Sequence, residues 1–167
     1  GKKPSREEED DEHHTAVPPA NEFTDEERLH LLQALWGSKK EKTPNALQPA
    51  QKEMLQRYLL HMALSNTVKP YYDGDELKFQ AESAEELAMV KFAQSCGYTK
   101  KGQNPTVVEI MPYAITEEGH PVPMPDKAET RTYNHIATCS FSSRRARVTL
   151  IYQQVAGFPN AKAKQNP

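Results

Sequence analysis

Several features that point to well-known protein functions are scarce or missing in this chain of 167 residues. It has two cysteines, Cys96 and Cys139, and their separation favours two reduced thiols, with a single disulfide as the alternative. The six histidines show no ligand spacing with cysteines or carboxylates, so we expect no metal site. No apolar run approaches the ~20 residues that a membrane-spanning helix needs. The charged amino-terminal residues lack the apolar segment of a secretory signal.

The charge balance and the glycines exclude further classes of protein. A formal net charge of −2 argues against a general nucleic-acid binder, which is normally basic. The glycine-rich patterns GxxxxGK and GxGxxG, which cradle phosphates in two common nucleotide-binding folds, are absent. We therefore expect no nucleic-acid partner and no phosphate-binding glycine loop.

Hydrophobic residues are also few, at 37% of the chain, against ~45–50% in an ordinary globular domain. The deficit is concentrated at the two ends, because Gly1–Asn21 is strongly acidic and Gly157–Pro167 is polar. Neither segment holds enough apolar surface to offset the entropy of ordering it. We predict a disordered acidic leader at 1–21, a folded domain at 22–156 and a disordered tail at 157–167.

Three segments have the pattern of helices. Thr24–Glu27 is a capping-box pattern, and the leucines behind it recur at helical spacing up to Trp36. A second helix is predicted over Pro49–Ser65, because proline is suited to a first helical position and an apolar stripe follows it. A third is predicted over Ser83–Gly97. The polar, lysine-rich segment Ser38–Gln48 is predicted to be a loop.

The strands are concentrated in the second half of the chain. Residue alternation and β-branched content predict strands at Leu77–Ala81, Thr106–Met111, Thr130–Ser140 and Arg147–Gln154. The last two flank the tight segment Phe141–Ala146 and form a predicted hairpin, while the proline-rich Glu117–Lys127 is a predicted loop. Strands grouped after helices favour an α+β fold with an antiparallel sheet flanked by helices.

Two segments resemble a known family. Leu77–Tyr98, LKFQAESAEELAMVKFAQSCGY, is similar to the pattern Y-Q-A-x-S-P-D-E-A-A-L-V-x-x-A-x-x-x-G-Y. Cys139–Ile151, CSFSSRRARVTLI, is similar to E-F-x-S-x-R-K-R-M-S-V-I. Both patterns belong to the nucleotide-binding domain of the phospholipid-flippase branch of P-type ATPases. Tyr58–Pro70 adds a weaker match, with Asn66 in place of a histidine, so the resemblance covers about Glu22–Val155.

The resemblance implies an antiparallel sheet flanked by helices, here incomplete on its carboxy-terminal side. Such a domain is the cytoplasmic part of an integral membrane protein that translocates phospholipids and hydrolyses ATP. It holds ATP by the adenine and delivers the γ-phosphate to an aspartate in a separate phosphorylation domain. The expected partners are ATP and the parent's phosphorylation and actuator domains, with magnesium bound only in the parent. The isolated domain is expected to be a monomer. It is also expected to lack ATPase activity, because the D-K-T-G-T motif is absent.

The resemblance also assigns a nucleotide site. Phe141 matches the aromatic residue that stacks on adenine, where base stacking is worth ~1–3 kcal/mol. Glu86 matches the carboxylate that contacts the adenine amino group. Ser143, Arg145 and Arg147 match the motif that contains Phe141. These five residues form the predicted site, in which we expect no catalytic residue.

Each assignment has an ordinary structural alternative. Glu86 stands three residues after Ser83, so it can be the capping-box partner of the third helix and nothing more. Phe141 can be a core aromatic residue. The basic run Arg144–Arg147 can be a solvated turn or a small patch for phosphate or nucleic acid.

One departure from the family pattern bears on function. Ala146 stands where the pattern has a lysine that holds the phosphates, and losing a charge-assisted contact costs ~1.5–3 kcal/mol. We therefore expect weak ATP binding, with a dissociation constant on the order of millimolar or weaker. One alternative is a degenerate flippase-like regulatory or scaffold module, for example one fused to a guanylyl cyclase, with weak or no nucleotide binding. Another is a protein-interaction domain whose acidic leader binds basic partners.

Overall fold

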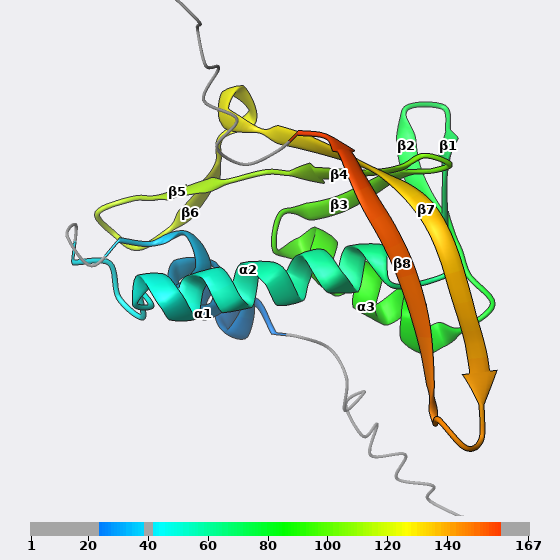
Figure 1. Ribbon diagram of the computed structural model, residues 1–167. Coiled ribbons are helices and arrows are strands. Elements are labelled where there is room, and N and C mark those ends of the chain that lie inside the picture. The colour runs from blue at the N-terminus through cyan, green and yellow to red at the C-terminus, as the bar shows by residue number, and fades with distance from the viewer. Residues whose placement is uncertain (1–23, 39–41, 158–167) are drawn as a thin grey trace, which may run out of the picture.

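The computed structural model describes residues 24–38 and 42–157. The predicted acidic leader and nearly all of the predicted tail lie outside the described residues. The order of elements is helix, helix, strand hairpin, helix and then six further strands (Figure 1). The helices are α1 (Asp25–Trp36), α2 (Pro49–Leu64) and α3 (Ala84–Ser95).

A four-stranded antiparallel sheet is the centre of the fold. Its strands lie in the order β3 (Tyr98–Gln103), β4 (Thr106–Ile110), β7 (Glu129–Ser142) and β8 (Arg147–Ala156). Two small antiparallel hairpins stand outside this sheet. They comprise β1 (Lys69–Asp73) with β2 (Glu76–Gln80), and β5 (Tyr113–Ile115) with β6 (Pro121–Pro123); a 3-10 turn follows at Pro125–Lys127. The mixture of helices and antiparallel sheets is the predicted α+β class.

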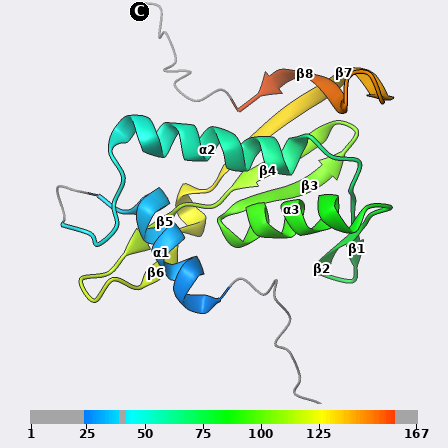
Figure 2. The same ribbon diagram turned by 90° about the horizontal axis from the view of Figure 1, so that it is seen from below.

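The three helices lie on one side of the four-stranded sheet (Figures 1 and 2). Their apolar stripes and the facing strand residues form a common core. Fully buried members of this core come from all three helices and from the sheet: Leu35, Leu59, Ala63, Ala93 and Val108. The described part of the chain contains no helix that is both long and apolar enough to cross a membrane.

The predicted helix signals are confirmed in detail. The Thr24 hydroxyl accepts the Glu27 amide at 3.2 Å, and the Glu27 carboxylate accepts the Thr24 amide at 2.9 Å, which completes the capping box of α1. Pro49 is the first residue of α2. The hairpin is also confirmed, although β7 continues two residues further than predicted and includes Phe141.

Several strands were not predicted, and their sequences explain why. β3 alternates buried and half-buried residues, but one of its buried positions is Lys100, which hides the apolar alternation. β1 and β6 contain proline, which counts against a strand because it cannot donate to a ladder. β6 therefore lies in the segment Glu117–Lys127 that the sequence predicts to be a loop, and that prediction is wrong for Pro121–Pro123.

Candidate functional site

Phe141 lies near the tip of the long β7–β8 hairpin, which extends past the helices at one end of the molecule (Figure 1). Its side chain is 62% exposed. The interpretation of Phe141 as a core aromatic residue is therefore wrong. An exposed phenylalanine offers a flat apolar face to solvent, which is the property that stacking on a purine requires.

The turn beside Phe141 carries the other predicted residues of the motif. The Arg145 guanidinium donates to the Ser140 carbonyl and, at 3.3 Å, to the Ser142 hydroxyl. Arg145 therefore folds back along its own hairpin. Arg147 opens β8 opposite Ser142 in the strand register, and Ser143, Arg145 and Arg147 are all exposed. The predicted motif residues are all exposed at the tip of this hairpin, and we call them the hairpin-tip group: Phe141, Ser143, Arg145 and Arg147.

Glu86 lies in the first turn of α3 and makes two kinds of contact. Its backbone amide donates to the Ser83 hydroxyl at 3.2 Å, so Ser83 caps the helix as predicted. Its carboxylate turns away from Ser83, because Oε2 accepts the Thr67 amide at 2.9 Å and the Thr67 hydroxyl at 2.6 Å. The capping interpretation is right for the amide of Glu86 and wrong for its carboxylate.

Beside Glu86 is a buried polar network that the sequence did not reveal. Lys100 of β3 is fully buried and its ammonium donates to Asn66 Oδ1 at 2.9 Å. Asn66 Oδ1 also accepts the Val68 amide, and Asn66 Nδ2 donates to carbonyls in the last turn of α2. Burial lowers the pKa of Lys100 to about 8, although the charge of Glu86 acts in the opposite direction. The only signal in the sequence is a lysine at an inward position of β3, which polarity rules assign to the surface.

Within residues 24–38 and 42–157, no hydrogen bond or ion pair joins Glu86 to the hairpin-tip group. The hairpin is nevertheless fixed close to the network around Glu86. The Tyr152 hydroxyl of β8 donates to the Leu64 carbonyl at 3.1 Å, two residues before Asn66. The ring of His135 packs edge-on against Tyr152 with a centroid separation of 5.4 Å. The hairpin base is thus attached to the end of α2, while its tip stays in solvent.

The described residues hold no cluster of three or more metal-ligating side chains. Cys96 is buried, Cys139 is exposed, and both are free thiols. The predicted site offers one exposed ring, guanidinium groups and a carboxylate, which can stack on a ligand and pair with its charged and polar groups.

Comparison with known proteins relates part of the chain to a lipid-transporting ATPase. No protein-family model matches the chain. Over 102 residues the chain is 28% identical to a phospholipid-transporting ATPase of Schizosaccharomyces pombe. The match covers 60% of this chain and 7% of that protein, so the chain spans only a small part of the length of this relative. The likeness supports a relation to flippase-type P-type ATPases.

Proposed function

We propose that this chain is the nucleotide-binding part of a phospholipid-transporting P-type ATPase. In this proposal it holds the adenine of ATP and presents the γ-phosphate to an aspartate of a separate phosphorylation domain. The observation that carries the proposal is the exposed ring of Phe141, at the position where the flippase pattern has its adenine-stacking residue. The sequence likeness to a phospholipid-transporting ATPase supports it.

The exposure of Phe141 has a physical cost that ligand binding would offset. Leaving a large apolar side chain in water forgoes ~1.5–3 kcal/mol of burial free energy. The neighbouring residues Ser140, Ser142 and Ser143 offer little apolar surface on which the ring could pack. Stacking on a purine would cover one face of the ring and recover part of that free energy.

Glu86 is suited to recognise the adenine amino group. Among the described residues, the hydrogen bonds that its carboxylate accepts all end on Oε2, from Thr67. Oε1 keeps its lone pairs for a further donor, and an exocyclic amino group is such a donor. The contacts of Thr67 fix the direction of the carboxylate in advance, which lowers the entropy lost on binding. The purine would then lie between Glu86 and the hairpin-tip group.

The phosphates of ATP would make fewer contacts with the protein than the adenine does. Arg145 is held by Ser140 and Ser142, and Ala146 supplies no charge. We therefore propose weak ATP binding, of millimolar order. Magnesium, the phosphorylation and actuator domains, and the cytoplasmic side of the membrane belong to the parent protein in this proposal.

The test is a titration of the chain with ATP, followed in backbone amide NMR spectra. We expect shifts at Phe141, Glu86 and their sequence neighbours at several millimolar ATP. Phe141→Ala should abolish these shifts with the folded spectrum retained, because the ring is exposed. Tyr72→Ala, which removes another aromatic side chain that is 55% exposed on β1, should leave them unchanged. ATP shifts of equal size in Phe141→Ala would contradict the proposal.

A gain-of-function variant separates weak binding from no binding. Ala146→Lys restores the cation of the family pattern, and one charge-assisted contact of ~1.5 kcal/mol corresponds to a roughly tenfold lower dissociation constant. If the chain is instead a degenerate regulatory module, which the alanine at 146 favours, neither the native chain nor this variant will respond to ATP.

A further inference from the structure

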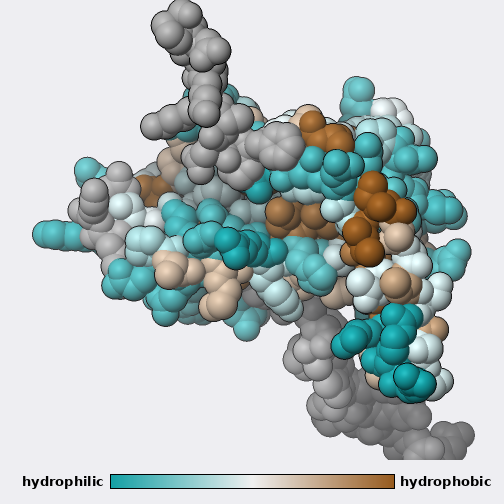
Figure 3. Space-filling model, in the orientation of Figure 1, coloured by the Kyte–Doolittle hydropathy of each residue, from teal (hydrophilic) through white to brown (hydrophobic). Residues whose placement is uncertain are grey.

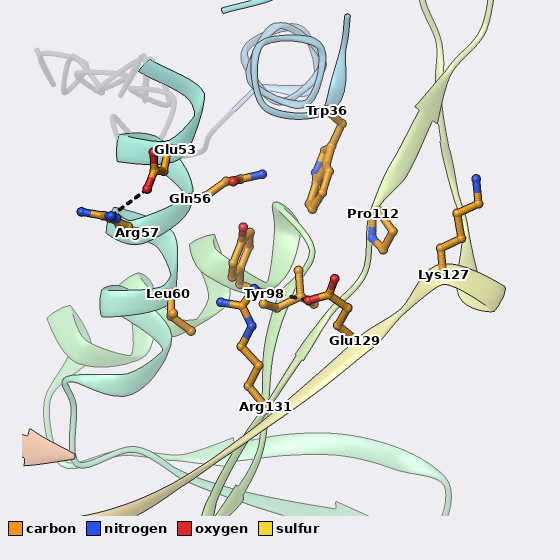
Figure 4. Close-up of a pocket in the computed structure, with 11 residues that line it drawn as sticks. Trp36, Glu53, Gln56, Arg57, Leu60, Tyr98, Pro112, Lys127, Glu129 and Arg131 are labelled. Carbon is orange, nitrogen blue, oxygen red and sulfur yellow. Dashed lines mark hydrogen bonds and ion pairs between the residues drawn. The ribbon is translucent and has the colours of Figure 1, made fainter. Parts of the chain in front are cut away.

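A cavity lies away from the predicted nucleotide site, between α2 and the sheet at the end where α1 packs. Its volume is ≈ 460 Å³, within the ~300–1,000 Å³ typical of small-molecule sites. Its walls come from α1, α2, β3, β4 and β7. Figure 4 shows Trp36, Tyr98 and Arg131 reaching the same space from three of these elements. No part of the proposed ATP site lines this cavity.

One wall of the cavity is aromatic. The rings of Trp36 and Tyr98 lie 6.2 Å apart between centroids with planes inclined by 24°. The Trp36 indole N–H donates to the Cys96 carbonyl at 3.3 Å, which fixes the orientation of that ring. Leu60 and Ile110 add aliphatic surface. A flat apolar molecule fits such a wall, because stacked or tilted aromatic contacts add to the free energy of simple burial.

The polar lining has an excess of positive charge. Arg57, Lys127 and Arg131 face two carboxylates, Glu53 and Glu129, which leaves one positive charge in excess. Glu53 is paired with Arg57 at 2.6 Å and Glu129 with Arg131 at 3.3 Å. Lys127 therefore has no carboxylate partner among the described residues. A ligand with one negative charge would balance the lining.

Arg131 supplies a specific anchoring point. Its side chain is only 18% exposed, and its Nη2 pairs with the Glu129 carboxylate at 3.3 Å. Tyr133 lies beside Arg131, whose charge and side-chain hydrogen bond lower the pKa of Tyr133 against the larger effect of burial. The part of the Arg131 guanidinium that lines the cavity can meet a carboxylate or phosphate oxygen of a ligand with a charge-assisted bond.

We propose that this cavity binds a small anion with a flat aromatic body, such as an aromatic carboxylate or aryl phosphate. The ring packs against Trp36 and Tyr98, and the anionic group meets Arg131 and Lys127. The site is separate from the proposed ATP site and does not depend on it.

The chain contains a built-in reporter for this proposal. Trp36 is its only tryptophan, so the indole N–H gives a single, unambiguous NMR signal. Benzoate and phenyl phosphate serve as probes, and benzamide serves as the uncharged control of the same shape as benzoate. We expect both anions to shift the Trp36 indole signal saturably, and benzamide to bind at least about tenfold more weakly. ATP binding at the hairpin should not move this signal.

Variants of the cavity residues test which positive side chains bind the anionic group of the ligand. Arg131→Gln and the exposed Lys127→Gln should each weaken benzoate binding several-fold and leave benzamide binding unchanged. Lys91→Gln makes the same change of charge on an exposed position of α3 that does not line the cavity, and should have no effect. If Arg131→Gln does not fold, Lys127→Gln still tests the proposal. The proposal is overturned if benzamide binds as well as benzoate, if the indole signal does not respond, or if Lys127→Gln binds benzoate like the native chain.

Discussion

Ala146 occupies a backbone conformation that favours glycine. Its φ is +51°, in the left-handed region, and its amide closes the hairpin turn by donating to the Ser142 carbonyl at 2.8 Å. A residue with a Cβ loses ~1–2 kcal/mol in this region, whereas glycine adopts it freely at some cost in unfolded-state entropy. The residue that weakens the predicted phosphate contact is thus also a strained point of the turn.

We therefore expect Ala146→Gly to raise the free energy of unfolding, by a few tenths to ~1 kcal/mol. Denaturant melts of the native chain and the variant measure this difference. Ala137→Gly, in the body of β7 with no positive φ, is the control and should destabilise by ~0.5–1 kcal/mol. A loss of stability in Ala146→Gly would contradict this account of the turn.

Lys100 makes a second residue-scale prediction, concerning pH. Its pKa falls from the ordinary 10.5 to about 8 because the ammonium is buried. Below pH 8 both the folded and the unfolded chain carry this proton. Between the two pKa values the folded chain releases it first, so the unfolded chain binds more protons and the unfolding free energy rises with pH.

The unfolding free energy of the native chain should therefore rise by ~2 kcal/mol relative to that of Lys100→Met between about pH 7 and about pH 9.5. Comparison with this variant cancels the titration of the tyrosines, which both chains share. Chemical denaturation across this pH range gives the two curves. If the unfolding free energies of the two chains change with pH in parallel, Lys100 keeps an ordinary pKa, and its burial beside Asn66 is contradicted.

At the scale of elements, the β7–β8 hairpin is attached to α2 through Tyr152. Its hydroxyl donates to the Leu64 carbonyl, one of the last carbonyls of that helix. Tyr152→Phe keeps the ring and deletes this bond together with a side-chain hydrogen bond to Thr106, so we expect a loss of ~0.5–1.5 kcal/mol and faster amide hydrogen exchange along β8. Tyr72→Phe on β1 has no such bond among the described residues and should be neutral. Unchanged amide exchange along β8 in Tyr152→Phe would mean that packing of the ring, without its hydroxyl, holds the hairpin against α2.

The elements also show what the sequence can predict. α1 and the hairpin were predictable because capping residues and alternation are local signals. β3 was missed because Lys100 is buried by tertiary contacts with Asn66, 34 residues earlier in the chain. The same limit applies to the site. The family resemblance predicts roles for Phe141 and Glu86 one by one, but the contact of Glu86 with Thr67 and the Lys100 network depend on how α2, α3 and β3 pack together.

At the scale of the whole molecule, β8 is an edge of the four-stranded sheet. Exposed apolar side chains gather over β7 and β8: Ile136, Val148, Ile151 and Val155. Figure 3 shows apolar surface over this hairpin. An unpaired edge with an apolar face favours pairing with another strand, so the expected monomeric state of the isolated domain stays a prediction.

The whole account depends on a purine stacking on Phe141. Saturation-transfer NMR measures this contact directly, by irradiating phenylalanine ring protons in an otherwise deuterated chain and recording the adenine protons of ATP. We predict strong attenuation of the adenine signals in the native chain, and none in Phe141→Leu with its folded spectrum intact. Equal attenuation in Phe141→Leu, or none in the native chain at several millimolar ATP, would contradict the assignment of an adenine site to this hairpin.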